Sequence, residues 1–211
     1  MTARSVSFAF LCEGSSDTGL IAHLETLLVY FGAQEATGMP DTRKGTIPAR
    51  LRQLLTEGTE AGIDMVFIHR DSDSPDREGR EREIRRGIEE SGFPHPFIPV
   101  IPVQETEAWL LLDEQAIRDV VACPKGKQPL KLPKPNAIEG TRNPKEILQK
   151  ALLAASRASG RRLKKEKNSF SRHRKVLLQR LDPFGAVRDL PSWQCLERDI
   201  KRALAQLENQ N

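Results

Sequence analysis

The chain of 211 residues has few aromatic residues and few cysteines. Aromatic side chains make up 5% of the residues, so we expect a core of aliphatic side chains. Cys12, Cys123 and Cys195 are odd in number and far apart, which argues against a disulfide framework and against a cysteine-ligated zinc site. The N-terminus lacks the long apolar stretch of a signal peptide. These absences predict a protein of the reducing cytoplasm.

Signals for several common functions are also missing. No apolar run approaches the ~18 residues that a membrane span requires. The sequence has no Walker phosphate-binding loop, no Gly-x-Gly-x-x-Gly motif and no Gly-x-Ser-x-Gly elbow. Tyr30 is the only tyrosine and lies in a helical pattern, which argues against a tyrosine nucleophile. The chemistry is therefore expected from carboxylates and basic side chains.

Charge is distributed unevenly along the chain. Residues 1–121 hold 12 Lys and Arg against 21 Asp and Glu, a net charge of −9. Residues 122–211 hold 21 against 8, a net charge of +13. An acidic half is suited to cations and a basic half to a polyanion, although charges also simply solvate helix faces.

The hydrophobic pattern predicts an α/β fold with a largely parallel sheet between helices. Strand-like stretches lie at residues 6–11, 64–68 and 97–103. Helical spacing occurs at residues 17–31, 45–58, 77–90, 105–121, 144–159, 170–181 and 190–207. We interpret residues 1–121 as an α/β core and residues 122–211 as a basic, mainly helical extension packed on it.

Carboxylates follow two of the predicted strands. Glu13 comes directly after the first strand, and Asp71 and Asp73 follow the second. Functional groups gather at the carboxyl ends of parallel strands, and clustered carboxylates need a cation such as Mg²⁺ or Mn²⁺ among them. Two alternatives stay open: Asp17 is a good helix N-cap, and the Asp71–Asp73 stretch fits a turn before Pro75.

These residues occur within a longer resemblance. Phe10-Leu11-Cys12-Glu13-Gly14 and the later Asp71-Ser72-Asp73 resemble the signature of Toprim-fold proteins. Pro102-Val103-Gln104-Glu105-Thr106-Glu107-Ala108-Trp109-Leu110-Leu111 is similar to a motif of the DUF4276 and RloB-like branch, which is related to old-phage-exclusion nucleases. Asn143-Pro144-Lys145 resembles the Asp-Pro-Lys motif of that branch, with Asn in place of Asp.

The resemblance implies a Toprim-like (Rossmann-like) core and a role for each acidic residue. It implies metal ligands at Glu13, Asp17, Asp71 and Asp73. Glu13 is also a candidate general acid or base, and Glu107 is a second catalytic candidate. Glu105 fits the start of a helix as well as it fits a site. His69 and Arg70 dilute the acidic character before the Asp pair.

The basic segment 157–175 holds nine Lys or Arg and one Glu. A phosphate backbone is the expected partner. The candidate nucleic-acid-binding residues are Arg161, Arg162, Lys164, Lys165, Lys167, Arg172, Arg174 and Lys175. A solvated loop or a protein-docking surface is the alternative reading.

Together these observations predict a Mg²⁺- or Mn²⁺-dependent nuclease that cleaves RNA, tRNA included, or DNA. The resemblance implies a place in bacterial anti-phage defence and an ATPase partner. The alternative is a catalytically weak adaptor that works with such an ATPase. Another phosphotransfer reaction stays open as a third reading. The apolar helix end at residues 27–31 fits either the core or a homodimer face.

Overall fold

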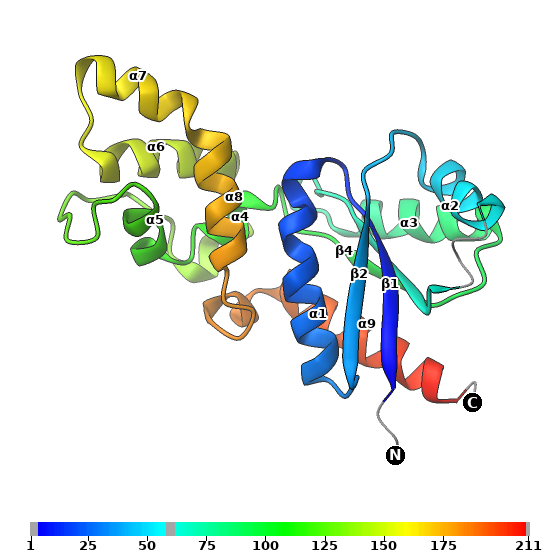
Figure 1. Cartoon of the computed structure of the whole chain (residues 1–211). Coiled ribbons are helices and arrows are strands. Elements are labelled where there is room, and N and C mark those ends of the chain that lie inside the picture. The colour runs from blue at the N-terminus through cyan, green and yellow to red at the C-terminus, as the bar shows by residue number, and fades with distance from the viewer. Residues whose placement is uncertain (1–3, 58–61, 210–211) are drawn as a thin grey trace.

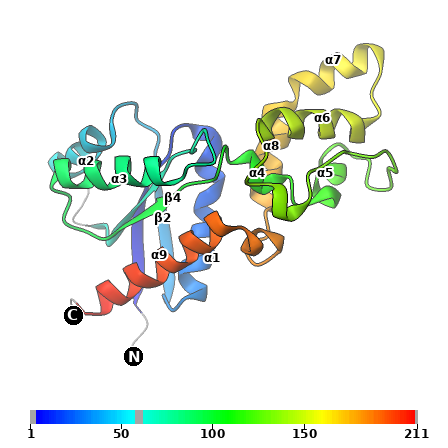
Figure 2. The ribbon, with the colours of Figure 1, turned by 180° about the vertical axis from the view of Figure 1, so that it is seen from behind.

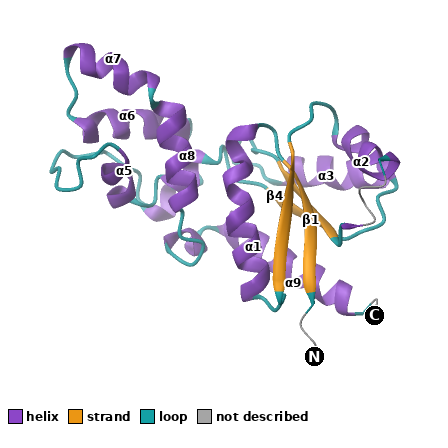
Figure 3. Ribbon diagram, viewed as in Figure 1, coloured by secondary structure: helices purple, strands orange, loops and turns teal. Residues whose placement is uncertain are grey.

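The computed structural model describes residues 4–57 and 62–209. Its four strands form one parallel sheet in the order β2-β1-β3-β4 (Figure 3). The strands are β1 (Ser5–Leu11), β2 (Glu35–Asp41), β3 (Met65–His69) and β4 (Phe97–Val100). This confirms the prediction of an α/β fold with a parallel sheet flanked by helices.

Helices cover both faces of the sheet. On one face lie α1 (Ile21–Tyr30) and α9 (Pro191–Glu208), and on the other lie α2 (Ile47–Thr56) and α3 (Glu78–Ser91). Successive strand residues face opposite sides, because side chains alternate along a strand. Phe8 and Phe67 accordingly pack with α1 and α9, whereas Leu11 and Val66 pack with α2 and α3.

The strand β2 was not predicted from the sequence. It contains Gly38 and Pro40, which are both depleted in strands. The structure accommodates Pro40 because β2 is an edge strand, where one side of the backbone needs no ladder partner. Gly38 is required by close packing, since an added Cβ would lie 2.4 Å from the Phe8 ring.

Two further local expectations differ from the structure. The helix expected from residue 17 begins as a 3₁₀ turn, η1 (Ser15–Leu20), and α1 follows it. Gly14 is the N-cap of η1, so Asp17 is not the cap. The strand expected at residues 97–103 is β4, and it ends at Val100.

Most remaining helices form a helical lobe beside the sheet (Figures 1 and 2). The lobe consists of α4 (Glu107–Leu110), α5 (Glu114–Val120), α6 (Pro144–Ser156), α7 (Gly160–Asn168) and α8 (Phe170–Arg180), with the short turn η3 (Pro135–Ala137). After the turn η4 (Ala186–Asp189), the chain returns to the sheet as α9. Trp109 of α4 and Trp193 of α9 pack edge to face with ring centroids 4.9 Å apart, which joins the lobe to the core.

Ser192, in the first turn of α9, takes part in the contact between the lobe and the core. Leu190 is the N-cap of α9, and the Glu139 side chain accepts a hydrogen bond of 3.0 Å from the backbone N–H of Ser192 in the first turn. The hydroxyl of Ser192 accepts a hydrogen bond of 3.1 Å from the indole nitrogen of Trp109. A buried indole N–H needs such a partner, so Ser192 helps to fix the contact between the lobe and the core.

Candidate active site

The ends of β1 and β3 meet at one edge of the sheet. These strands are parallel neighbours, with Leu11 opposite Ile68. Glu13 follows β1, and its Oε1 accepts a hydrogen bond of 3.0 Å from Nη1 of Arg70, which follows β3. The carboxylate of Glu13 is 39% exposed. The segments that follow β1 and β3 therefore lie at the same carboxyl edge, as expected for neighbouring parallel strands, and Arg70 pairs with Glu13 there.

Asp71 is held firmly in this edge. Its Oδ1 accepts hydrogen bonds from the backbone N–H and the hydroxyl of Thr106, both at 2.9 Å. The buried His69 places Nε2 3.0 Å from the Thr106 hydroxyl and 3.5 Å from the same Asp71 oxygen. Burial alone would raise the pKa of Asp71, but His69 and the two Thr106 bonds hold it below its usual range. Asp71 is thus kept ionised and oriented.

Asp73 is held by a different element from Asp71. Its backbone has a positive φ of 55°, and its carboxylate is 67% exposed. Oδ2 of Asp73 accepts a hydrogen bond of 2.6 Å from Arg80 of α3, whose Nε also donates to the Asp71 carbonyl. The two carboxylates of the Asp-x-Asp motif therefore have different partners, Thr106 for Asp71 and Arg80 for Asp73, although Arg80 also contacts the Asp71 backbone.

Glu105 fits, from the sequence alone, either the start of a helix or a place in the acidic site. Its Oε2 accepts a hydrogen bond of 3.1 Å from the backbone N–H of Lys145, in the first turn of α6. Burial raises the pKa of Glu105, and the negative charges of Glu107 and Asp71 raise it further. The hydrogen bond from the Lys145 N–H acts in the opposite direction and lowers it. Glu105 therefore lies within electrostatic range of Asp71, in a region of excess negative charge. The Glu-x-Glu motif was the signal that pointed to it.

Asp17 and Glu107 meet around Arg174, and all three side chains are buried. Arg174 of α8 donates from Nη2 to Asp17 Oδ1 at 2.7 Å and from Nε to Glu107 Oε1 at 2.8 Å. Burial would lower the pKa of Arg174, but the two carboxylates raise it above its usual value. The structure thus joins a predicted metal ligand, a predicted catalytic residue and a predicted nucleic-acid contact in one internal ion cluster. No sequence spacing signals this pairing, because Asp17 and Arg174 are 157 positions apart.

The fit of a divalent cation can be tested against these contacts. Among the described residues, no three His, Cys, Asp or Glu side chains converge as a preformed metal cage. Asp71 Oδ2 and Glu105 Oε1, however, accept no hydrogen bond from any described residue, while their partner oxygens are anchored. Mg²⁺ is commonly bound by one or two carboxylates completed by water and substrate phosphate. The donors therefore fit a cation shared with a phosphate, and do not fit a four-carboxylate site.

The basic segment forms α7 and the exposed face of α8. We call its exposed cations the α7 surface, which consists of Arg161, Arg162, Lys164, Lys165, Lys167, Arg172 and Lys175. Within the parts of the chain that the structure describes, no acidic side chain forms an ion pair with any of these seven. Arg174, the eighth predicted contact, is buried in the cluster with Asp17 and is not part of this surface.

Helix α3 is also rich in arginine, but nearby carboxylates neutralise the charge of its arginines. Each arginine of α3, and Arg77 that precedes it as the N-cap, pairs with a nearby carboxylate; the set is Arg77, Arg80, Arg82, Arg85 and Arg86. Four of these pairs join residues four positions apart, the spacing at which opposite charges face each other on a helix. The positive charge of the α7 surface is thus not a general property of the arginine-rich helices.

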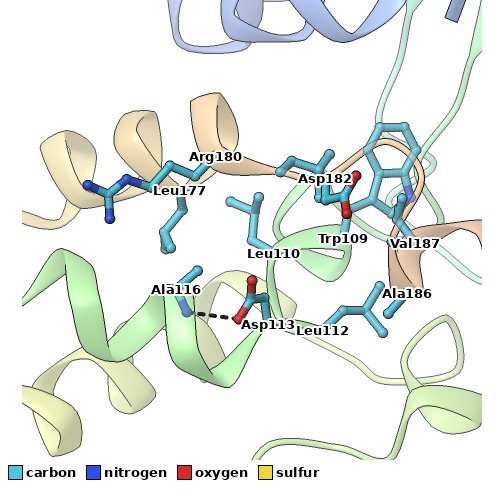
Figure 4. Close-up of a pocket in the computed structure, with 12 residues that line it drawn as sticks. Trp109, Leu110, Leu112, Asp113, Ala116, Leu177, Arg180, Asp182, Ala186 and Val187 are labelled. Carbon is cyan, nitrogen blue, oxygen red and sulfur yellow. Dashed lines mark hydrogen bonds between the residues drawn. The ribbon is translucent and has the colours of Figure 1, made fainter. Parts of the chain in front are cut away.

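A separate pocket of about 230 Å³ lies in the helical lobe, between α5, the end of α8 and the 181–187 segment (Figure 4). Its wall includes Trp109, Leu110, Leu177 and Val187. Asp113 also lines it, and its side chain caps α5 by accepting a hydrogen bond of 2.8 Å from the Ala116 N–H. None of the predicted site residues lines it. Trp109 and Leu110 are both buried in the hydrophobic core.

Comparisons with known proteins identify one family. The family model described as "Domain of unknown function (DUF4276)" matches residues 12–200, which are 189 of the 211 residues. Comparison with curated proteins and with solved structures gave no match. The search for membrane-spanning helices, made over the described residues, found no helix of sufficient length and apolar character.

Proposed function

The chain belongs to the DUF4276 family, and we propose that it is a nuclease with a Toprim-like core that hydrolyses phosphodiester bonds in a nucleic acid. One observation carries the proposal. Asp71 and Glu105 are each anchored through one carboxylate oxygen and offer the other, at the carboxyl edge of a parallel sheet. Burial raises the pKa of Glu105, the charges of Glu107 and Asp71 raise it further, and a bound cation there would relieve both effects.

In this proposal, Asp71 and Glu105 would hold a Mg²⁺ or Mn²⁺ ion together with a substrate phosphate. The ion, when bound, would polarise the phosphoryl group and lower the pKa of a coordinated water. Thr106 and His69 fix Asp71, and the Lys145 N–H fixes Glu105, so both carboxylates are oriented before substrate arrives.

Glu13 is the better candidate for accepting a proton from the attacking water. Its carboxylate is exposed at the edge, and only Oε1 is bonded, to Arg70. Glu107 is less suitable, because it is buried and its Oε1 is bonded to Arg174. We therefore assign the general-base role to Glu13 and a structural role to Glu107.

The α7 surface would bind the phosphate backbone of the substrate. Its seven exposed cations have no acidic partner among the described residues, so they can exchange counterions for phosphates. This surface does not distinguish RNA from DNA, so both polymers, and tRNA among the RNAs, are candidate substrates. The likeness to RloB-like proteins supports a setting in anti-phage defence, with an ATPase as partner.

The test is cleavage of labelled RNA, tRNA, single-stranded DNA and duplex DNA in Mg²⁺, Mn²⁺ or EDTA. We expect cleavage that requires the metal and that falls at least 100-fold in Asp71→Asn and Glu105→Gln. Glu89→Gln, which changes an exposed glutamate of α3, is the matched control and should cleave as the wild type does. Cleavage that survives both EDTA and the two site variants would exclude this site.

A second candidate function is a catalytically weak adaptor for an ATPase. The observation in its favour is that arginines already pair with four of the acidic candidates, namely Glu13, Asp17, Asp73 and Glu107. Mn²⁺ binding without cleavage of any of the four polymers, alone or with ATP and a candidate ATPase, would favour this reading over the nuclease.

A further inference from the structure

The guanidinium of Arg174 has an oxygen environment that resembles a cation site. It donates to Asp17 Oδ1 at 2.7 Å, to Glu107 Oε1 at 2.8 Å and, through Nη1, to the Ser16 carbonyl at 3.0 Å. Two carboxylates and a carbonyl are the donor types that Mg²⁺ and Ca²⁺ use in proteins. These donors come from η1 and α4, and the cation comes from α8 of the helical lobe.

We propose that Arg174 is a built-in cation, which occupies a position between Asp17 and Glu107 that a divalent metal ion would otherwise take. Asp71 and Glu105, at the carboxyl edge of the sheet, then remain available to an exchangeable metal ion; their part in binding metal rests on the proposed function. Arg174 differs in this respect from Arg172 and Lys175 beside it, which are exposed and have no acidic partner among the described residues.

The charge balance of the cluster supports this assignment. Asp17 and Glu107 are both more than nine-tenths buried, and two buried carboxylates with no cation between them repel strongly. A guanidinium is permanently charged and has donors in a fixed planar fork, so it can bind both carboxylates and the carbonyl at once. Unlike a metal ion, it cannot exchange with solvent, and chelators cannot remove it.

Removing Arg174 should therefore create a metal site. In Arg174→Ala, the space of the side chain is left facing Asp17, Glu107 and the Ser16 carbonyl. We expect this variant to bind one more Mn²⁺ than the wild type. Without metal its melting temperature should fall by about 10 °C, because a buried carboxylate pair has lost its partner. Mn²⁺ should restore most of that loss.

The experiment counts bound Mn²⁺ by electron paramagnetic resonance and follows thermal unfolding with and without Mn²⁺. Three controls accompany Arg174→Ala. Arg174→Lys keeps a cation in place and should bind no additional ion. The triple variant removes all three charges and should also bind no additional Mn²⁺; it is Asp17→Asn/Glu107→Gln/Arg174→Ala. Arg50→Ala removes another buried arginine, whose partner Asp41 keeps its bond to Arg43, and should lose stability without recovery in Mn²⁺.

The outcomes separate this inference from the proposed function. Equal Mn²⁺ counts in the wild type and Arg174→Ala would overturn the inference, as would a wild-type ion that is lost on Asp17→Asn. If the wild type binds no Mn²⁺ and Arg174→Ala binds one, the inference holds and the metal site proposed at Asp71 and Glu105 fails. If Arg174→Ala is unfolded without metal, folding on Mn²⁺ addition supports the inference. Failure to fold in Mn²⁺, when the triple variant folds, overturns it.

Discussion

Thr106 donates both its backbone N–H and its hydroxyl to one oxygen of Asp71, each over 2.9 Å. The same hydroxyl lies 3.0 Å from Nε2 of the buried His69. Thr106 and His69 therefore fix one oxygen of Asp71 and leave its second oxygen available. This arrangement resembles the outer hydrogen bonds that orient carboxylates in metal sites.

Thr106→Val should weaken metal binding without removing a carboxylate. Valine keeps the shape of the buried threonine but loses the hydroxyl, so Asp71 loses one of its two donors. Loss of such an outer contact typically lowers metal affinity by about 10-fold or more. Titration of the wild type and the variant with Mn²⁺ measures the change. Thr106→Ser retains the hydroxyl and should bind nearly as the wild type does; equal affinity in the valine variant would contradict the role given to Thr106.

Glu105 should make stability depend on pH. Its folded pKa is raised, so ionisation is less favourable in the folded than in the unfolded chain. Below the unfolded value of about 4.3 the side chain is protonated in both states and costs nothing. As the pH rises through that value and then through the higher folded value, stability is lost.

Glu105→Gln should remove this loss. In EDTA we expect the variant to be more stable than the wild type at pH 7, by less than about 1 kcal/mol because solvent screens a half-exposed carboxylate. The difference should vanish near pH 4. Urea unfolding at the two pH values provides the measurement. A variant that is less stable at both would show that the bond from the Lys145 N–H outweighs the repulsion from Asp71 and Glu107.

The sequence predicted the parallel sheet and one half of the site, because both depend on local patterns. Apolar runs marked β1, β3 and β4, and the residues that follow parallel strands must share one edge. Glu13 follows β1 at this edge and accepts a hydrogen bond from Arg70, which follows β3 and directly precedes Asp71. The edge strand β2 was missed, because Gly38 and Pro40 are unfavourable in an isolated strand and acceptable only beside β1.

The pairing of charges could not be predicted from the sequence. From the sequence there is no reason to separate the eight candidate cations of the basic segment, yet Arg174 is buried whereas Arg172 and Lys175 on the same helix are exposed. Asp17 and Glu107 are brought to Arg174 only by the packing of η1 and α4 against α8. Such long-range ion pairs depend on tertiary contacts, which a single sequence does not encode in its periodicity.

Gly38 provides a test of the packing between β2 and the sheet. Gly38→Ala places a Cβ 2.4 Å from the Phe8 ring and 2.6 Å from Ile21, so strand or helix must shift. We expect a loss of about 1–3 kcal/mol in the free energy of unfolding. Gly62→Ala is the control, since nothing lies within 4 Å of its added Cβ. Denaturant unfolding of both variants measures the difference, and equal stability would place β2 farther from β1 than described.

The α7 surface should determine how binding of nucleic acid depends on salt. In Lys164→Ala/Lys165→Ala/Lys167→Ala, three exposed cations without acidic partners among the described residues are lost. If each contacts a phosphate, the slope of log affinity against log salt should decrease in magnitude by about 2 for single strands and about 3 for duplex DNA, and affinity should fall for every polymer. The matched variant on α3, Arg82→Ala/Arg85→Ala/Arg86→Ala, removes the same charge from residues already paired with glutamates. Fluorescence anisotropy from about 50 to 200 mM salt compares the two. An equal loss in both would mean that overall charge, and not the α7 surface, holds the nucleic acid.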